Sequence, residues 1–408
     1  SQGSGNAEWL RGFAARLAEA MGLQQATLQG TEAARQFLLE TLQLIVDQQS
    51  NPQQIYPLWA QQPSRFNAEL LAVLPSVAAQ LLQRNTEQRT LIAALLGEFG
   101  NLIQQFPLGM RWLNLEIAIT AYQQSLQVMT REALPVEWAQ SMMNLANAYR
   151  NRIRGDRAEN LEQAIAAYQQ SLEVMTREAL PVEWATSMNN LATAYVERIR
   201  EDRAENIEQA IVAYQQSLQV RTREALPVKW ATSMNNLANA YYSRIRGDRA
   251  ENLEQSIAAY QNSLEILTPE LLPNDCRRTA RSLGNLYFGE TRWEEAVSVY
   301  QMALKAAETL YQSASLLDSQ AAELSETADL PRRAAYALAR SGALQQAVET
   351  LERGRARGLS ESLDRDRADL SQLQQTHSDI YSGLPGNRQP TSQPGKPAAR
   401  SHDFYRAL

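Results

Sequence analysis

The chain has 408 residues, a formal net charge of −6 and a single cysteine, Cys276. One cysteine excludes a disulfide framework and fits a reducing cytoplasm, and the acidic balance disfavours nucleic acid as a partner. We find no signal peptide and no apolar run long enough to span a bilayer, so we expect a cytoplasmic protein without a membrane partner.

The N-terminal part is expected to be helical but outside any repeat. Residues 1–7 begin Ser-Gln-Gly-Ser-Gly and have the composition of an expression scar, which we expect to be disordered. Residues 8–94 carry apolar side chains at helical spacing, such as Leu38, Leu42 and Ile45. Prolines interrupt this pattern, and we interpret the segment as an N-terminal helical cap; they are Pro52, Pro57, Pro63 and Pro75.

From residue 138 onward the sequence repeats with a fixed period. Trp138, Trp184 and Trp230 are 46 residues apart, and the blocks 138–183 and 184–229 differ at 11 of 46 positions. A period of this size predicts a solenoid, because each unit must stack on its neighbour to bury its apolar face.

Each unit contains two helical patterns. The first starts at a proline such as Pro135, which a first helical position tolerates. The second is predicted to start at Asn160, with Gln163 three residues on as a capping box. The tyrosine of the first helix recurs as Tyr149, Tyr195, Tyr241 and Tyr287, and we expect Tyr195 to be buried between the helices of its repeat.

The residues of these two helices resemble a known repeat. Leu145-Ala146-x-x-Tyr149, followed by Ala164 and Tyr168, resembles the tetratricopeptide pattern L-G-x-x-Y…A-x-x-x-F. The standard unit has about 34 residues, so six of the surplus residues fall between the helices and six between the repeats.

The register extends beyond the three clear copies. Residues 95–132 fit a degenerate repeat, and the spacing of Ala335, Leu338, Gly342, Ala347 and Leu351 fits a weaker one at the other end. The predicted fold class is therefore all-α: a right-handed α-solenoid of about six tetratricopeptide-like helix pairs over residues 95–373, preceded by the helical cap.

Longer phrases resemble the N-terminal repeat region of bacterial CHAT-family proteins, in which a tetratricopeptide array precedes a caspase-like cysteine peptidase domain. The phrases lie at 101–109, 130–139, 152–174 and 347–370. The resemblance implies that the array positions or restrains its own C-terminal peptidase domain in the intact protein. Residues 374–408 are rich in proline and glycine, which is typical of a linker, and end in what we interpret as a truncated segment, so we expect the peptidase to be absent from this chain.

The inventory of reactive side chains supports no catalytic site. A caspase-like site needs a histidine followed by a cysteine, whereas His377 and His402 both follow Cys276. We interpret Cys276 as a thiol on a helix face or in a loop, although a nucleophile is the alternative. We expect no enzyme activity, no metal site and no cofactor.

Differences between the copies point to a ligand-binding surface. Five of the 11 differences between the first two blocks lie on one face of the first helix, which by resemblance lines the concave groove of the array. Drift at exposed positions predicts the same variability. The candidate groove for a protein or peptide ligand comprises Asn101, Gln140, Met143, Asn144, Asn147, Arg150, Asn189, Asn190, Thr193, Asn235, Asn236, Asn239, Tyr242, Arg278, Arg281 and Asn285.

The asparagines of this set allow two interpretations. An amide both donates and accepts, so a ladder of asparagines can bind the backbone of an extended peptide; alternatively, the same amides bond the repeats to one another. Arg278 and Arg281 form an incomplete clamp, so we do not predict a ligand bound through its terminal carboxylate.

The arginines between the two helices also allow two interpretations. Arg152, Arg154 and Arg157 recur at the same spacing in the next two copies, interleaved with acidic residues such as Asp156 and Glu159. A self-neutralising ladder is one interpretation, and a nucleic-acid-binding solenoid is the alternative function. The function that the sequence favours is a protein-interaction scaffold.

Overall fold

The computed structural model describes residues 23–84, 88–313, 323 and 325–355, and every element within them is a helix. This confirms the predicted all-α class. Contacts divide the chain into two compact units, Ser1–Leu267 and Thr268–Leu408, which are described separately.

The first unit begins with helices that share a core with the repeats. Asn51 caps the second of them by accepting a hydrogen bond from the Gln53 backbone nitrogen at 3.0 Å. The Trp59 ring lies 4.9 Å from Phe66 and 5.4 Å from Phe106, so one aromatic cluster joins these helices to the repeats. The elements are α2 (Leu23–Asp47), α3 (Pro52–Trp59), the 3₁₀ turn η1 (Pro63–Arg65) and α4 (Ala68–Arg84).

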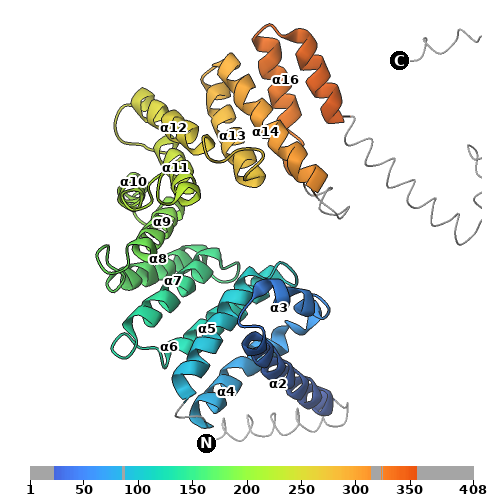
Figure 1. The fold of residues 1–408 in the computed structure, drawn as a ribbon, viewed down its shortest axis with the longest axis vertical. Helices are drawn as coiled ribbons and strands as arrows, with labels where there is room; N and C mark the ends of the chain where they lie inside the picture. The colour runs from blue at the N-terminus through green and yellow to red at the C-terminus, as the bar shows by residue number, and fades with distance from the viewer. Residues whose placement is uncertain (1–22, 85–87, 314–322, 324, 356–408) are drawn as a thin grey trace, which may run out of the picture. The chain divides into compact units, whose positions relative to one another are not determined.

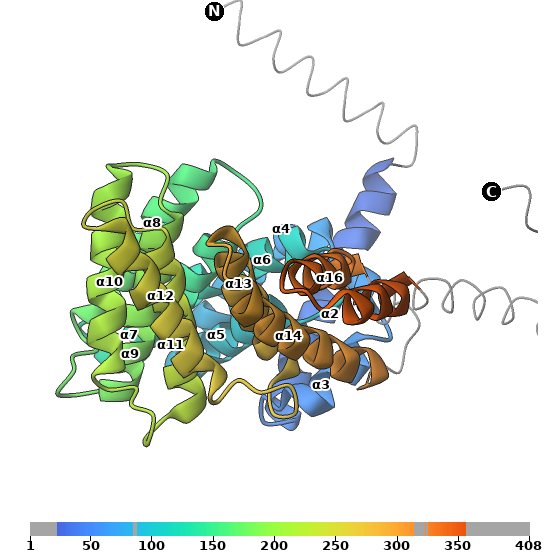
Figure 2. The ribbon, with the colours of Figure 1, turned by 90° about the horizontal axis from the view of Figure 1, so that it is seen from above.

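Four consecutive antiparallel helix pairs follow in the same unit (Figures 1 and 2). They include the degenerate pair that the register predicts before the three clear copies. The pairs are α5 (Arg89–Gln105) with α6 (Arg111–Leu126), α7 (Pro135–Asn151) with α8 (Arg157–Leu172), α9 (Pro181–Glu197) with α10 (Arg203–Leu218), and α11 (Pro227–Tyr242) with α12 (Arg249–Leu264).

The second helix of each pair begins three residues before the predicted position. Asp156, not Asn160, is the N-cap of α8, and its carboxylate accepts from the Glu159 backbone nitrogen at 2.8 Å. Asn160 is buried inside the helix and donates to the Arg154 carbonyl at 2.8 Å, which fastens the loop. The predicted start was wrong because both residue types cap helices, and the aspartate comes first along the chain.

The prediction that Tyr195 is buried between the helices was also wrong. Tyr195 is half-buried at the edge of the core, and its hydroxyl accepts a hydrogen bond from Gln169 Nε2 at 3.1 Å. The fully buried tyrosines of the clear copies, Tyr168 and Tyr214, lie in the second helices. A tyrosine at a core edge packs its ring while its hydroxyl stays within reach of polar partners, and the sequence period does not separate the two cases.

The first helices of the pairs form one continuous face. Helix α7 contacts both α5 and α9, and α9 contacts α11, while second helices of neighbouring repeat pairs make fewer contacts with one another. The first helices therefore lie on the inner side of the curve within this unit, and we call the surface of α5, α7, α9 and α11 the first-helix face.

The second unit contains one helix pair with the standard spacing and a shorter pair after it. A methyl group on Gly284 would come within 2.6 Å of the Tyr300 ring, so glycine is required where these two helices cross. Ala335, Leu338 and Ala347 form a small cluster, as the weaker register predicts. The elements are α13 (Pro273–Gly289), α14 (Trp293–Ser313), α16 (Leu330–Arg340) and a helix at 344–355.

Candidate functional site

Asparagine side chains link successive first helices. Asn144 Nδ2 donates to Asn101 Oδ1 at 2.8 Å, and one repeat further Asn190 Nδ2 donates to Asn147 Oδ1 at 3.1 Å. Asn147 Oδ1 also accepts from the hydroxyl of Tyr168 at 2.6 Å. These amides therefore hold neighbouring repeats together, as the structural interpretation of the ladder requires.

This ladder changes at α11. Asn236 occupies the register of Asn190, but the position that faces it holds Thr193, whose hydroxyl lies 2.9 Å from that of Tyr214. Asn236 accepts a long bond of 3.4 Å from Asn235, and no bond donated by its own amide is found among the described residues. Asn236 is thus the amide of the ladder with the most hydrogen-bonding capacity left for a ligand.

The remaining predicted residues of the first unit differ in exposure. Met143 and Asn189 are buried, and Arg150 lies 3.6 Å from Glu197 in an ion pair. Tyr242 is exposed. Gln140, Asn235 and Asn239 are half-buried on α7 and α11.

Three predicted residues lie on α13, in the second unit. Arg278 and Asn285 are exposed, and Asn285 Oδ1 accepts from the Tyr300 hydroxyl at 2.8 Å. Arg281 lies 3.4 Å from Asp329. Arg281, one of the two arginines of the incomplete clamp, is therefore already engaged in an ion pair with Asp329.

A pocket of about 320 Å³ opens on the first-helix face between α5, α7 and the start of α9. Three predicted groove residues, Asn101, Gln140 and Asn144, line it. Met129 and Met175 are both buried and contribute an apolar floor. The other lining residues are Ala94, Gly97, Glu98, Tyr122, Val136, Glu137, Ser141, Leu180 and Glu183.

The pocket carries negative charge. Glu98, Glu137 and Glu183 line it, and no lysine or arginine does. A pocket with an apolar floor and polar groups at its rim suits a side chain of a bound segment.

The arginines between the helices are paired within the array. Arg198 donates from Nε and Nη2 to both carboxylate oxygens of Glu162, at 2.8 and 2.7 Å, and Arg244 does the same to Glu208. These hydrogen bonds hold the pKa of Glu162 below its usual range, and Arg200 lies 3.0 Å from Glu159. The ladder is self-neutralising at these positions, and its guanidinium groups are engaged rather than presented to phosphates.

Cys276 does not have the environment of a nucleophile. Its side chain is buried in the second unit, and burial raises the pKa of the thiol to about 12. At neutral pH it therefore stays protonated, whereas the thiolate is the reactive form. In the described part of the chain there is no group of side chains arranged to hold a metal ion, and no helix there is long and apolar enough to cross a membrane.

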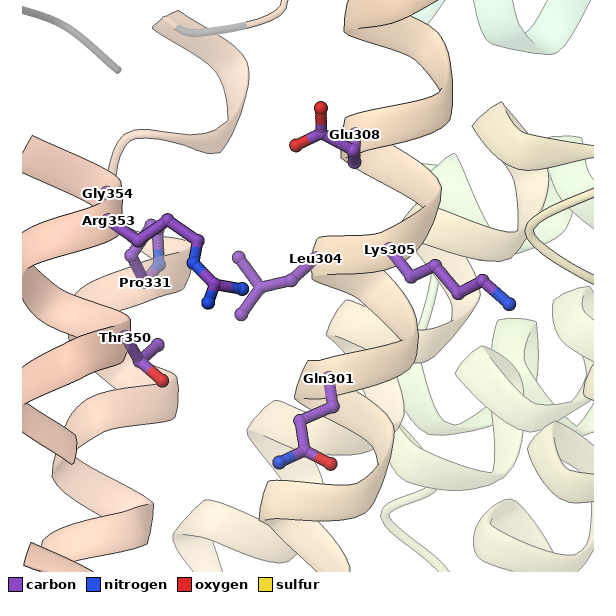
Figure 3. A pocket seen from close by; sticks show the side chains of 8 residues that line it. All are labelled: Gln301, Leu304, Lys305, Glu308, Pro331, Thr350, Arg353 and Gly354. Carbon is purple, nitrogen blue, oxygen red and sulfur yellow. The ribbon is translucent and has the colours of Figure 1, made fainter. Parts of the chain in front are cut away.

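The second unit contains a separate pocket of about 420 Å³ between α14, the start of α16 and the last helix (Figure 3). Leu304 and Arg353 extend toward each other across it, and Lys305 points away. Its other lining residues are Gln301, Glu308, Pro331, Thr350 and Gly354. None of the predicted site residues lines this pocket.

Sequence analysis missed one residue that bonds to two of the first helices, Arg221. It is buried between α9 and α11 at the register that Met129 and Met175 occupy in the preceding copies. Its exchange for methionine is one of the 11 differences between the blocks, but it falls in a turn after the second helix, outside the face that we considered.

Comparison with solved structures gives distant likenesses. BtubC (BKLC) from P. vanneervenii is 17% identical with a TM-score of 0.44, over 70% of this chain and 99% of that chain. A Rap protein complexed with competence and sporulation factor is 13% identical with a TM-score of 0.42, over 71% and 81%. The TPR2AB domain of yeast Sti1 in complex with pHSP90 is 20% identical with a TM-score of 0.24, over 58% and 97%. No curated protein matches the chain.

The model of the tetratricopeptide repeat matches three segments, 138–174, 184–223 and 230–266. They correspond to the three clear copies and to the helix pairs α7 to α12. Repeats of this kind support a protein-interaction scaffold. The chain therefore contains tetratricopeptide repeats, stacked as a solenoid of helix pairs.

Proposed function

We propose that the chain is a regulatory scaffold that binds an extended segment of a partner protein on the first-helix face. The observation that carries this proposal is the pocket between α5, α7 and α9, whose lining includes the three predicted groove residues Asn101, Gln140 and Asn144. An apolar floor with amides and carboxylates at the rim recognises a side chain and the backbone beside it.

The resemblance to CHAT-family repeat regions extends the proposal to the intact protein. There, a segment bound on the first-helix face would control a C-terminal caspase-like peptidase, through the junction at residues 347–370. Two of the structural neighbours are complexes, one of a Rap protein with competence and sporulation factor and one of the TPR2AB domain of yeast Sti1 with pHSP90. We take from them no ligand identity for this chain.

The test uses a random peptide library displayed on phage and selected against the full chain. Affinities of the selected peptides are then measured for the wild type and for Ala94→Trp, which places a large ring in the pocket. Position 94 tolerates a longer side chain, since its equivalent in the next repeat is Gln140. Ala166→Trp is the matched control, because Ala166 is exposed on the second helix α8.

Ala94→Trp is expected to weaken the selected peptides at least tenfold, and Ala166→Trp less than twofold, with both variants folded by circular dichroism. Equal affinities for all three proteins would mean that the peptides bind elsewhere. In the intact protein, Ala94→Trp should also remove the effect of the peptide on peptidase activity.

A further inference from the structure

Arg221 is a buried cation with no carboxylate partner among the described residues. Only 5% of the residue is exposed. Its Nη1 donates to Ser233 Oγ at 3.0 Å and its Nη2 to Thr186 Oγ1 at 2.9 Å, while Nε makes no hydrogen bond within the described chain. Burial lowers the pKa of the guanidinium to about 10, so it remains charged at neutral pH. Burying a charge whose partners are all neutral costs stability.

Packing does not require a cation at this register. Met129 and Met175 occupy the same place in the two preceding copies, and both are buried. Their sulfur atoms lie within 3.5 Å of the hydroxyls of Ser125 and Ser171, respectively. The same fold is therefore built with an apolar side chain at this register, and we expect Arg221 to lower the stability of its repeat.

The surroundings of Arg221 have changed together with it. Thr186 replaces Gln140 and is one of the two hydroxyl partners of the guanidinium. Asn189 replaces Met143, and its Oδ1 accepts from Ser233 Oγ at 2.9 Å. The step from α9 to α11 thus has a polar cluster where the step before it has buried methionines.

A second cation lies at the start of the next helix. Lys229 is exposed in the first turn of α11, at the register of Glu137 in α7 and Glu183 in α9. A glutamate there is favoured by the helix dipole, whereas a lysine is disfavoured. Two positions of one copy, eight residues apart in the sequence, have therefore exchanged a structurally favourable residue for a cation. Residues that break a local structural rule are expected at functional sites.

We propose that Arg221 and Lys229 form a carboxylate-binding subsite on the first-helix face, between α9 and α11. The subsite rests on the proposed function and adds the chemistry of the ligand. It takes a carboxylate of the bound segment, from an acidic side chain or from a chain terminus. The hydroxyls of Thr186 and Ser233 hold the guanidinium in place, and the ligand carboxylate supplies the counter-charge that the fold omits.

The first test needs no ligand, because sulfate serves as the probe anion. Thermal unfolding of the full chain is measured in sodium sulfate and in sodium chloride at equal ionic strength, which separates site binding from general salt effects. Arg221→Met restores the residue of the sister copies. Arg223→Met is the matched control, since it removes the same charge from an exposed residue that pairs with Glu265 and lies over Trp230.

In the wild type and in Arg223→Met, sulfate is expected to raise Tm by about 2 °C or more beyond its effect on Arg221→Met. Arg221→Met itself should melt above the wild type in chloride. An equal sulfate effect on all three proteins overturns the subsite.

The second test uses the peptides selected on the full chain, synthesised with amidated and with free carboxyl termini. Each glutamate or aspartate of a selected peptide is replaced in turn by glutamine or asparagine. One such replacement should weaken binding to the wild type at least fivefold and binding to Arg221→Met less than twofold. If the free terminus is the source, amidation of the peptide has this effect instead.

The two proposals fail in different ways. If the peptides bind Ala94→Trp more weakly but keep their affinity when their carboxylates are replaced by amides, the scaffold function is supported and the subsite is refuted. A sulfate effect confined to proteins with Arg221, without any peptide that senses Ala94→Trp, supports the subsite and refutes the proposed binding of a protein segment.

Discussion

The side-chain amide of Asn190 in α9 donates a hydrogen bond to Asn147 Oδ1 in α7, across 3.1 Å. One repeat later, Asn236 has the same register, but Thr193 occupies the position that corresponds to Asn147. Asn190 and Asn236 occupy the same position in two copies, but within the described chain only Asn190 bonds to the preceding first helix. Variants of the two residues can therefore distinguish a structural role of the asparagine ladder from a ligand-binding role.

Asn190→Ala should lower the free energy of unfolding by about 1 kcal/mol, because it removes one partly buried hydrogen bond while Tyr168 still satisfies Asn147. Asn236→Ala should lower it by less than about 0.5 kcal/mol. Urea titration monitored by circular dichroism measures both. Equal losses would show that the ladder continues unchanged into α11.

For binding of a selected peptide, we expect the opposite order: Asn236→Ala should have the larger effect and Asn190→Ala the smaller. Asn236→Ala should weaken a peptide that spans α9 and α11 about tenfold, since it leaves a ligand group unpaired in the groove. Asn190→Ala should have a smaller effect per folded molecule. Unchanged binding by both variants would leave the asparagines with a structural role.

Glu201 lies in the left-handed region of backbone conformation, with φ of 67°, where the sister loops have Gly155 and Gly247. A side chain is strained there and glycine is not. Glu201→Gly should therefore stabilise the array by about 1 kcal/mol. Thermal unfolding of this variant beside Gly155→Glu, which should destabilise, checks the argument. A lower Tm for Glu201→Gly would contradict it.

The bidentate ion pairs between repeats predict loss of stability in acid. Hydrogen bonds from Arg198 and Arg244 hold the pKa values of Glu162 and Glu208 below their usual range. A lowered pKa in the folded state contributes stability above the unfolded pKa of about 4.3, and that stability disappears as pH falls through the folded value.

The double variant Glu162→Gln/Glu208→Gln should therefore be less stable than the wild type at pH 7, by about 1 kcal/mol for each pair. At pH 3 the two proteins should differ less, because the carboxylates of the unfolded wild type are then largely protonated and no longer favour the folded state. Urea titrations at both pH values measure this. A difference that does not change with pH would show that the pairs stabilise by packing alone.

Cys276 is expected to be inert while the chain is folded. Burial raises the pKa of its thiol to about 12, so the thiolate fraction at pH 8 is small and the sulfur is covered. Alkylation by iodoacetamide should follow the rate of unfolding and become fast only in denaturant. Rapid labelling of the native chain would contradict the buried environment.

The repeat period was sufficient to predict the helix pairs, because stacking of equivalent units leaves few alternatives. It did not fix which of two capping residues begins a helix, since Asp156 and Asn160 both suit the role and geometry decides between them. It also did not show that Tyr195 lies at the edge of the core. How deeply a side chain is buried depends on the neighbouring repeats that pack against it, and the repeat period alone does not describe that packing.

The candidate site was predictable in part. Sequence comparison of the copies located the face to which Asn101, Gln140 and Asn144 contribute, and these three line its pocket. It did not show that Asn144 and Asn101 bond to each other, nor that Arg221 reaches this face from a turn. Such contacts join residues far apart in sequence, so they became visible only with the fold.

The central claim is that the first-helix face binds a protein segment, and amide hydrogen exchange of the full chain tests it most directly. Exchange is compared with and without a saturating selected peptide. We predict slower exchange in α5, α7, α9 and α11 and little change in α6, α8, α10 and α12. Protection confined to the second helices, or to the pocket of the second unit, would contradict the claim.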